Sequence, residues 1–218
     1  AFLDECTARI DGLLARKRRL VQLLKEKRQA LITRAVTRGL DAKVKLKESG
    51  VSWLDAVPEG WRIMPLKHLC AIPITDGPHE TPEFLDEGVP FVSAEAIWDG
   101  RIHMESIRGH VSHEDNDRFA QKYSPRMNDI YMVKSGSTTG RIALVDFEPE
   151  FNIWSPLAAI RCNDALAFFK FVYHAMSSDY FQKQVQTSWS FGTQPNIGMG
   201  VIENLLIALP DRKEQQRL

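Results

Sequence analysis

The stretch that decides the fold is residues 2–38, which read FLDECTARIDGLLARKRRLVQLLKEKRQALITRAVTR. Apolar side chains recur there on a heptad: Leu3, Ile10, Leu24 and Leu31 share one position, and Cys6, Leu13 and Leu20 share the position three residues later. An average spacing of 3.5 residues keeps such side chains on one side of a helix, facing a partner helix. The pattern therefore predicts one long helix, about 55 Å at 1.5 Å per residue. We expect it to end near Gly39, after a basic last turn.

We call these apolar positions the apolar seam. The residues predicted to pair with another helix are Leu3, Ile10, Leu13, Leu20, Leu24 and Leu31. Lys17 also falls at a seam position, where a polar residue tunes register at some cost in stability.

The charge of the chain is unevenly distributed. The formal net charge is zero, but residues 1–40 hold ten Lys and Arg against four Asp and Glu, a net +6 that leaves −6 in residues 41–218. The whole-chain charge predicts no partner, whereas the basic helix is either an ordinary solvated face or a surface that lies along phosphates.

Cysteine usage and hydropathy indicate the compartment. Three cysteines, odd in number and far apart in sequence, favour a reducing cytosol over a disulfide scaffold. No run of 18 apolar residues exists, since the longest apolar stretch, 165–176, contains Lys170 and His174. No signal peptide pattern is present. We expect a soluble, cytoplasmic protein without a membrane partner.

The rest of the chain predicts an α+β fold, a long coiled-coil helix followed by a mixed α/β domain rich in short strands. Residues 41–60 are predicted to be a connector, 61–210 a globular domain, and 211–218 the first turn of another helix. Runs with β character recur at 61–66, 89–93, 129–134, 141–146, 154–161 and 204–209. A helical stretch over 165–186 is expected to break at 177–179, where Ser and Asp suit an N-cap. Strands and helices do not alternate regularly, which argues against a doubly wound sheet. Because both ends read as helices cut short, we expect the chain to be part of a longer one.

Catalytic motifs are missing from the sequence. Residues 152–156 do not form the Asn/Asp-Pro-Pro-aromatic run of an amino-methyltransferase, and only three residues separate Gly136 from Gly140, too few for a P-loop. No Gly-x-Ser-x-Gly or HExxH motif occurs. His110 and His113, followed by two acidic residues, are a weak candidate for a metal site, and a polar loop is the favoured interpretation. We therefore predict no enzyme activity and no metal.

One segment has the chemistry to bind a polyanion. Residues 134–141, Lys-Ser-Gly-Ser-Thr-Thr-Gly-Arg, lie between two predicted strands. The glycines allow backbone amides to approach a ligand, and hydroxyls and two cations flank them. The candidate DNA contacts are Lys134, Ser135, Gly136, Ser137, Thr138, Gly140 and Arg141. An ordinary solvated hairpin loop is the alternative.

Two further segments are candidates, each with an ordinary surface loop as the alternative. Thr75, Asp76 and His79 belong to a turn with Asp-Gly-Pro at its centre, and Gln194 and Asn196 carry amides that can bond adenine. Trp154, Trp189 and Phe191 are interpreted as core residues rather than as stacking platforms for bases.

Taken together, four runs resemble the specificity subunit of type I restriction-modification systems. They are the basic heptad helix (2–32), Val57-Pro58-Glu59-Gly60-Trp61, the pair 74–77 and 134–141, and Gly192-Thr193-Gln194-Pro195-Asn196-Ile197 with Leu209-Pro210 and Glu214-Gln215-Gln216-Arg217. They look like the family's spacer helix, the start of its target recognition domain, landmarks inside that domain, and the exit into the next spacer helix.

The resemblance implies a DNA-recognition role without catalysis. Each recognition domain would read one half of a split site in double-stranded DNA, and antiparallel helices would set the gap between the halves. Methyltransferase subunits would hold the helices and flip the target adenine, and a restriction and translocase subunit would join them. S-adenosylmethionine, ATP and Mg would belong to those partner subunits, with no cofactor in this chain.

The chain departs from the family pattern by carrying one recognition domain instead of two. It is therefore expected to be either a fragment or a half-sized subunit that pairs with itself. A coiled-coil scaffold with a protein-binding head is the competing interpretation, and it predicts partner binding with no dependence on DNA.

Overall fold

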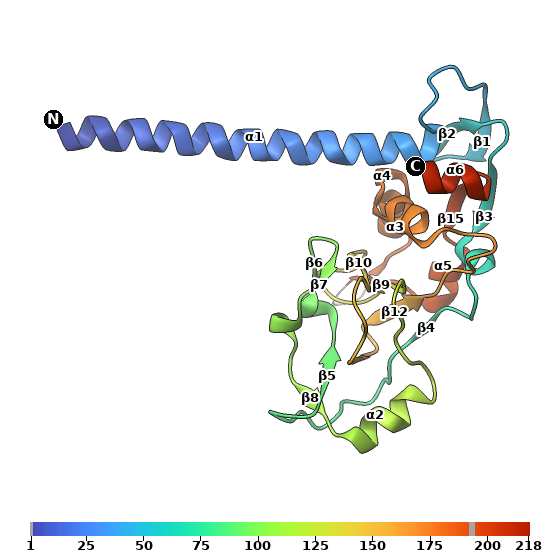
Figure 1. Cartoon of the computed structure of the whole chain (residues 1–218). Helices are drawn as coiled ribbons and strands as arrows, with labels where there is room; N and C mark the ends of the chain where they lie inside the picture. Colours follow the sequence, from blue (N-terminus) through green and yellow to red (C-terminus); the bar gives the residue numbers. More distant parts are fainter. Residues whose placement is uncertain (1, 192–194) are drawn as a thin grey trace.

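The computed structural model describes residues 2–191 and 195–218, and one long helix projects from a body of short strands and helices (Figure 1). This helix, α1 (Phe2–Arg38), has 37 residues. It ends where Gly39, at φ +72°, takes the left-handed conformation, and the Gly39 amide donates to the Ala35 carbonyl at 3.0 Å. The predicted helix and its end are confirmed.

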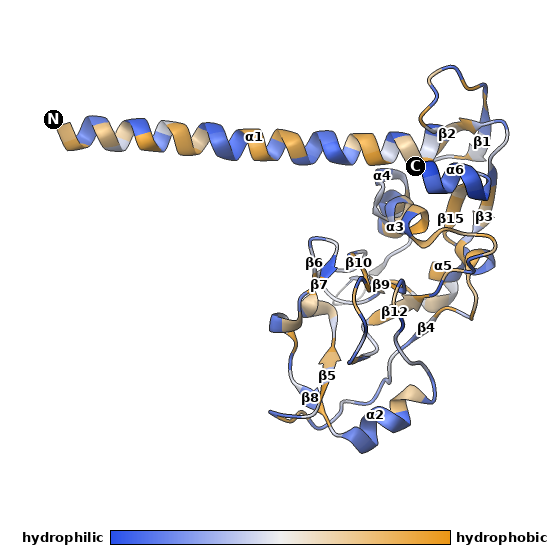
Figure 2. Ribbon diagram, in the orientation of Figure 1, coloured by the Kyte–Doolittle hydropathy of each residue, from blue (hydrophilic) through white to orange (hydrophobic). Residues whose placement is uncertain are grey.

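Among the described residues, the body is contacted only by the C-terminal part of α1. Val36 and Thr37 are buried, whereas the helix-pairing residues of the apolar seam are all largely exposed. Their exposed fractions are 77% for Leu3, 56% for Ile10, 49% for Leu13, 56% for Leu20, 55% for Leu24 and 56% for Leu31. Figure 2 shows apolar stretches, coloured orange, recurring along the projecting part of α1, with no other segment drawn against it.

A β-hairpin follows α1 in the stretch expected to be a connector. Strands β1 (Leu46–Val51) and β2 (Leu54–Pro58) pair antiparallel. The sequence analysis did not identify these two strands inside the connector, because β1 is almost wholly exposed and carries no apolar alternation. The hairpin is held through β2, whose Leu54 and Val57 are buried in the main core.

A four-stranded sheet forms the centre of the body, and smaller sheets surround it. Its order is β10-β9-β12-β4, with β4 Thr75–Asp76, β9 Ile130–Val133, β10 Ile142–Leu144 and β12 Leu157–Ile160. A sheet of order β11-β5-β8 comprises β5 Val89–Val92, β8 His110–Val111 and β11 Asn152–Ile153. The remaining pairs are β3 (Arg62–Pro65) with β15 (Leu206–Leu209), β6 (Ile97–Trp98) with β7 (Arg101–Ile102), and β13 (Ser190–Phe191) with β14 (Pro195–Asn196). Only β11 and β5 pair in parallel, so the described sheets agree with an α+β fold.

Short helices pack against the sheets and the turns between them. They are α2 His113–Ala120, α3 Phe169–Ser177, α4 Asp179–Thr187, α5 Met199–Asn204 and α6 Arg212–Arg217, with 3₁₀ turns at Leu66–Leu69, Ala94–Ala96 and Met104–Ser106. The predicted break between α3 and α4 occurs at Ser178. Its hydroxyl donates to the Ala175 carbonyl instead of capping α4.

Helix α2 replaces the polar loop that the sequence analysis expected after His110. The Ser112 side chain accepts a hydrogen bond from the Asp115 amide at 3.0 Å, so Ser112 is the N-cap. Two acidic residues in the first turn complement the helix dipole. The expectation of a loop was wrong because this capping pattern was interpreted only as candidate metal chemistry.

The main apolar core lies where α3 and α4 pack against the sheets, and it reaches the end of α1. Trp61 packs its ring edge-to-face against Phe171, with centroids 6.2 Å apart. The Trp61 indole donates to Glu214 of α6 at 3.1 Å. Gln215 is buried and accepts from the Phe168 amide at 2.7 Å. These contacts hold α6 beside the end of α1.

Candidate nucleic-acid interface

The structure brings together the three segments that the sequence analysis selected as candidate DNA contacts. Asp76 and Lys134 form an ion pair, with 3.2 Å between Oδ2 and Nζ. The Gly136 amide donates to the Pro195 carbonyl at 3.0 Å, and the Ile197 amide donates to the Lys134 carbonyl at 2.8 Å. The loop at 134–141 therefore lies between the other two segments.

Asp76 is the centre of a cluster of charges beneath these loops. Its side chain is 8% exposed and pairs with Lys122 at 2.5 Å, Lys134 at 3.2 Å and His79 at 3.1 Å. Burial raises the pKa of Asp76, but hydrogen bonds and charge from Lys122 and Lys134 outweigh it and hold the pKa below its usual range. Because the Lys134 side chain is only 12% exposed, it ties the loops together instead of projecting into solvent.

Gly77, next to Asp76, has no room for a side chain. A Cβ at this position would lie 2.1 Å from the Ile153 carbonyl oxygen. The neighbouring Ser155 amide donates to the Pro78 carbonyl at 3.3 Å. The turn is thus pressed onto β11 and the residues that follow it.

The loop between β9 and β10 is shaped by its glycines. Gly136 at φ +98° and Gly140 at φ +93° take conformations that favour glycine. The Thr139 hydroxyl donates to the Gly136 carbonyl at 2.8 Å, which closes the turn internally. Arg141 is exposed, and its guanidinium donates a long hydrogen bond of 3.5 Å to the Ile97 carbonyl.

The other predicted contacts differ in accessibility. Ser137, His79 and Asn196 are exposed, whereas Thr75, Ser135 and Thr138 are half-buried. Gln194 lies outside the described residues. Of the three aromatic residues interpreted as core, Trp154 and Trp189 are half-buried, and Arg108 lies over the Trp154 ring at 5.2 Å.

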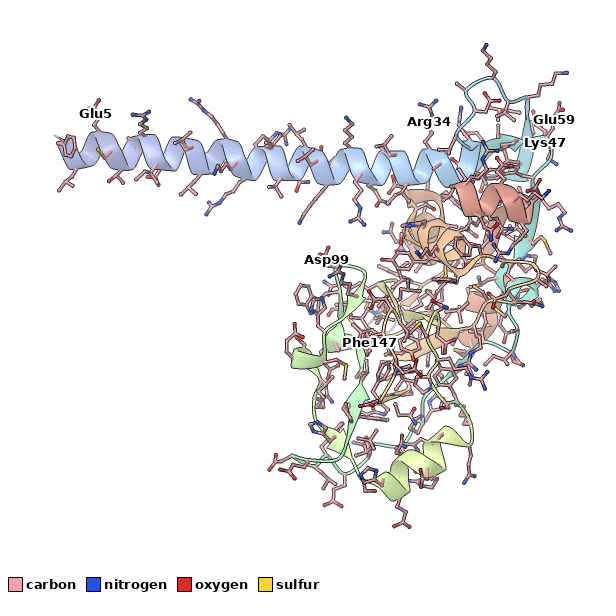
Figure 3. All side chains as sticks on the ribbon, in the orientation of Figure 1. Glu5, Arg34, Lys47, Glu59, Asp99 and Phe147 are labelled. Carbon is pink, nitrogen blue, oxygen red and sulfur yellow. The ribbon has the colours of Figure 1, made fainter. Side chains whose placement is uncertain are left out.

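A cleft of about 530 Å³ separates α1 from the body beside Arg141. Its wall on α1 is formed by Lys25, Arg28, Gln29 and Ile32, and its wall on the body by Trp98, Asp99, Gly100, Thr139, Gly140, Arg141, Ile142, Tyr173, His174, Ser177 and Gln182. Figure 3 shows Asp99 on the side of the body that faces α1. Sequence reasoning missed Lys25, Arg28 and Trp98 as site residues because only the fold places them next to Arg141.

Helices α3 and α4 position both walls of this cleft. Gln29 of α1 donates to the Ser177 carbonyl at 2.7 Å, and the Asp179 amide donates to the Thr33 hydroxyl at 3.1 Å. On the other side, the Tyr173 hydroxyl donates to the Gly100 carbonyl at 3.1 Å, and Gln182 donates to the Gly140 carbonyl at 3.0 Å. These hydrogen bonds connect α3 and α4 to α1, to the β6–β7 hairpin and to the β9–β10 loop, and they fix the arrangement of the three elements.

The β6–β7 hairpin carries an aromatic side chain at the edge of the cleft. Trp98 is 41% exposed and stacks on His103, with ring centroids 3.2 Å apart and planes inclined by 11°. His103 also pairs with Glu105 at 2.9 Å. The stack fixes the orientation of the Trp98 ring.

The cleft is electropositive. Burial, followed by the charges of Arg28 and Lys170, lowers the pKa of His174, so this residue is neutral at neutral pH. Among residues 2–191 and 195–218, no acidic side chain forms an ion pair with Lys25, Arg28 or Arg141.

Two kinds of feature are absent from the described residues. These residues contain no group of three or more His, Cys, Asp and Glu side chains placed to hold a metal ion. They also contain no helix long and apolar enough to cross a membrane.

Comparison with known proteins places this geometry in context. The sequence profile of the type I restriction modification DNA specificity domain matches residues 58–218. The chain is 25% identical to the type I restriction enzyme EcoBI specificity subunit of Escherichia coli, over 99% of this chain and 46% of that protein. It is 19% identical to the MjaVIII specificity subunit of Methanocaldococcus jannaschii, over 95% and 48% respectively. The chain thus spans about half the length of these curated relatives.

Solved structures share the fold. The HsdS subunit from Thermoanaerobacter tengcongensis superimposes with a TM-score of 0.52 at 21% identity, covering 96% of this chain and 46% of that one. A long helix followed by a mixed domain is therefore an arrangement found in known proteins.

Proposed function

The chain belongs to the family of type I restriction modification DNA specificity domains, and from this premise we propose that it reads one half of a bipartite DNA sequence. The convergence of three loops, distant in sequence, on one exposed surface carries the proposal. Exposed groups on that surface include the Arg141 guanidinium and the hydroxyl and imidazole groups of Ser137 and His79. Such groups bond base edges and phosphate oxygens.

In this proposal α1 sets the distance between two reading domains. A helix of this length spans about 55 Å, enough to separate two domains by more than one turn of B-DNA, roughly 34–36 Å. The exposed apolar seam calls for a second helix to cover it. In Figure 1, the C-terminal end of α6 lies beside the end of α1, and α6 runs in the direction opposite to α1, which supports an antiparallel partner.

The chemistry of the complex is assigned to other subunits. Methyltransferase subunits would bind the paired helices, use S-adenosylmethionine and flip the target adenine. A restriction and translocase subunit would supply ATP- and Mg-dependent cleavage. We place the assembly in the cytoplasm, and self-pairing through α1 is the alternative to a second helix in the same polypeptide.

The test is a selection of the assembled complex on random duplexes, followed by sequencing of the bound fraction. The expected result is a split sequence with a gap of constant length. Arg141→Ala should cost about 1–3 kcal/mol on the selected duplex and relax one position. Arg62→Ala, an exposed cation on β3 outside the cleft lining, is the matched control. Equal recovery of all duplexes would refute the proposal.

A scaffold with a protein-binding head is the second candidate, and the exposed apolar seam favours it as well. A scaffold would bind its partner equally with and without DNA. Under that function, substitutions in the β9–β10 loop would leave the complex unaffected.

A further inference from the structure

We propose that the side of α1 facing the domain is itself a DNA-contacting surface, where Lys25 and Arg28, across the cleft from Arg141, bind backbone phosphates of the duplex. This inference rests on the proposed function and assigns to the long helix a second role besides spacing.

Charge is the first argument. The cleft brings together the Lys25, Arg28 and Arg141 side chains with a single carboxylate, Asp99. The chain as a whole is neutral, and residues 41–218 carry a net −6. A domain with that charge needs a local concentration of cations to hold a polyanion. The described structure supplies one at this cleft, partly from the basic helix.

The second observation is that these cations form no ion pairs within the described residues. Within the described residues, none of the three has an acidic partner, whereas Lys122 and Lys134 nearby are both committed to Asp76. Uncommitted cations facing one another across a gap repel each other, so an anion between them lowers the free energy of the arrangement.

Rigidity is the third argument. Gln29, the residue after Arg28, donates a hydrogen bond to the Ser177 carbonyl. Arg28 is therefore next to a point at which α1 is anchored to the body. The hairpin opposite is fixed in turn, because Tyr173 donates to the Gly100 carbonyl. A Cβ at Gly100 would lie 2.2 Å from the Tyr173 hydroxyl, so the two elements are in direct contact. The cations are therefore presented on two preorganised walls.

The arrangement is compatible with a second helix on the apolar seam. One residue step along an α-helix turns by about 100°, so Lys25 points away from its seam neighbour Leu24. A partner helix that covers Leu24 leaves the Lys25 side of α1 open toward the domain. Arg28, four residues after Leu24, lies at the border between seam and cleft, where its long side chain can extend toward the domain.

The experiment measures binding of the assembled complex to fluorescent duplexes over a series of salt concentrations. The probes are the duplex enriched by the selection above and a random-sequence duplex of equal length. We compare the double variant Lys25→Ala and Arg28→Ala with the unchanged complex. Each phosphate contact contributes about 0.9 to the slope of log K against log salt, so the double variant should lose about 1.8 on both probes.

Two controls separate contact from folding. Arg34 lies nine residues after Lys25, on the opposite side of α1 at about 100° per residue, and Figure 3 shows it pointing away from the body. Arg34→Ala should leave the slope unchanged. The double variant Lys25→Arg and Arg28→Lys keeps both charges and should retain most of the slope. All variants should elute as the same complex.

The outcomes are distinguishable. An unchanged slope for the Lys25 and Arg28 double variant, with discrimination of the selected duplex intact, would overturn this inference and leave the proposed function standing. A decrease of the salt slope that is equally large for Arg34→Ala would also overturn the inference. Failure of the unchanged complex to discriminate duplexes would instead refute the proposed function.

Discussion

At the scale of single residues, the cluster around Asp76 decides where the candidate loops lie. One buried carboxylate holds Lys122 and Lys134, and these cations come from an α2-flanking turn and from the β9–β10 loop. Lys134 is therefore a positioning residue in our interpretation. Arg141, at the other end of the same loop, is exposed and is the better candidate for contact with DNA. The two residues should respond differently to substitution.

Lys134→Ala should lower stability and DNA binding together, because it removes a partner from the buried Asp76. Arg141→Ala should lower binding without changing the melting temperature. Thermal unfolding and duplex binding, measured on both variants, check this. A Lys134→Ala variant with unchanged melting and weakened binding would contradict our interpretation.

Asp76→Asn should reduce stability at neutral pH by about 1–3 kcal/mol, because two cations lose their buried counter-charge. The folded-state pKa of Asp76 lies below its ordinary value of 3.8. Its stabilising contribution is therefore complete above that value and disappears as the pH falls through the lower folded-state pKa. Unfolding of both proteins by denaturant at several pH values should show the difference shrinking below about pH 4. A difference that stays constant down to pH 2 would exclude this origin.

Gly77→Ala should destabilise the fold by about 1–3 kcal/mol, since the added Cβ overlaps the Ile153 carbonyl and the packed turn must move. Gly200→Ala is the matched control, because nothing lies within 4 Å of a Cβ at that position of α5. Denaturant unfolding of the two variants side by side makes the comparison. Equal stability for both would mean that the Gly77 turn is not packed as described.

At the scale of elements, α1 is a helix whose first half has no tertiary support from the described part of the chain. Isolated helices are marginal in water, so its order depends on intrinsic propensity and on a covering partner. Gly12, with nothing near it, is the weakest point of this stretch.

Gly12→Ala should stabilise the first half of α1 by about 0.5–1 kcal/mol, the usual cost of glycine inside a helix. The expected result is slower amide hydrogen exchange between residues 5 and 20, with no change in the melting of the body. Unchanged exchange would indicate that these residues are already held by another helix in solution.

Elements with a strong pattern were predictable from the sequence, and elements created by tertiary contact were not. The heptad pattern predicted α1. Each of the six predicted strand runs contains an observed strand, such as β9 within 129–134. Two-residue strands such as β4 and β6 are too short to show a period, and β1 is exposed on both faces. The candidate site follows the same rule. The composition of the 134–141 loop identified Arg141. Lys25 lies more than a hundred residues earlier in the sequence, and the packing of α3 and α4 brings it to the same cleft.

At the scale of the whole molecule, the projecting helix leaves a long apolar surface in water. Large exposed apolar patches on soluble proteins mark interaction sites. The apolar seam is therefore expected to be covered in the assembled complex, by the start of another spacer helix or by a second copy of the chain.

The double variant Leu13→Glu and Leu24→Glu should abolish the helix pairing, and with it the assembly with methyltransferase subunits, that the proposed function requires. Both side chains are about half exposed, 49% and 55%, so the body should melt at the same temperature. Size-exclusion chromatography with light scattering reports assembly, and calorimetry reports melting. A lower melting temperature would show that the seam packs inside the chain.

The contact between Trp61 and Glu214 brings the end of α1 and the start of α6 to one corner of the body. Because the polypeptide leaves one helix and returns to the next at the same place, residues 40–210 form a cassette on a single stem. Under the proposed function, exchange of that cassette between related chains is expected to change the DNA sequence that is read while leaving α1, and the gap that it sets, unaltered.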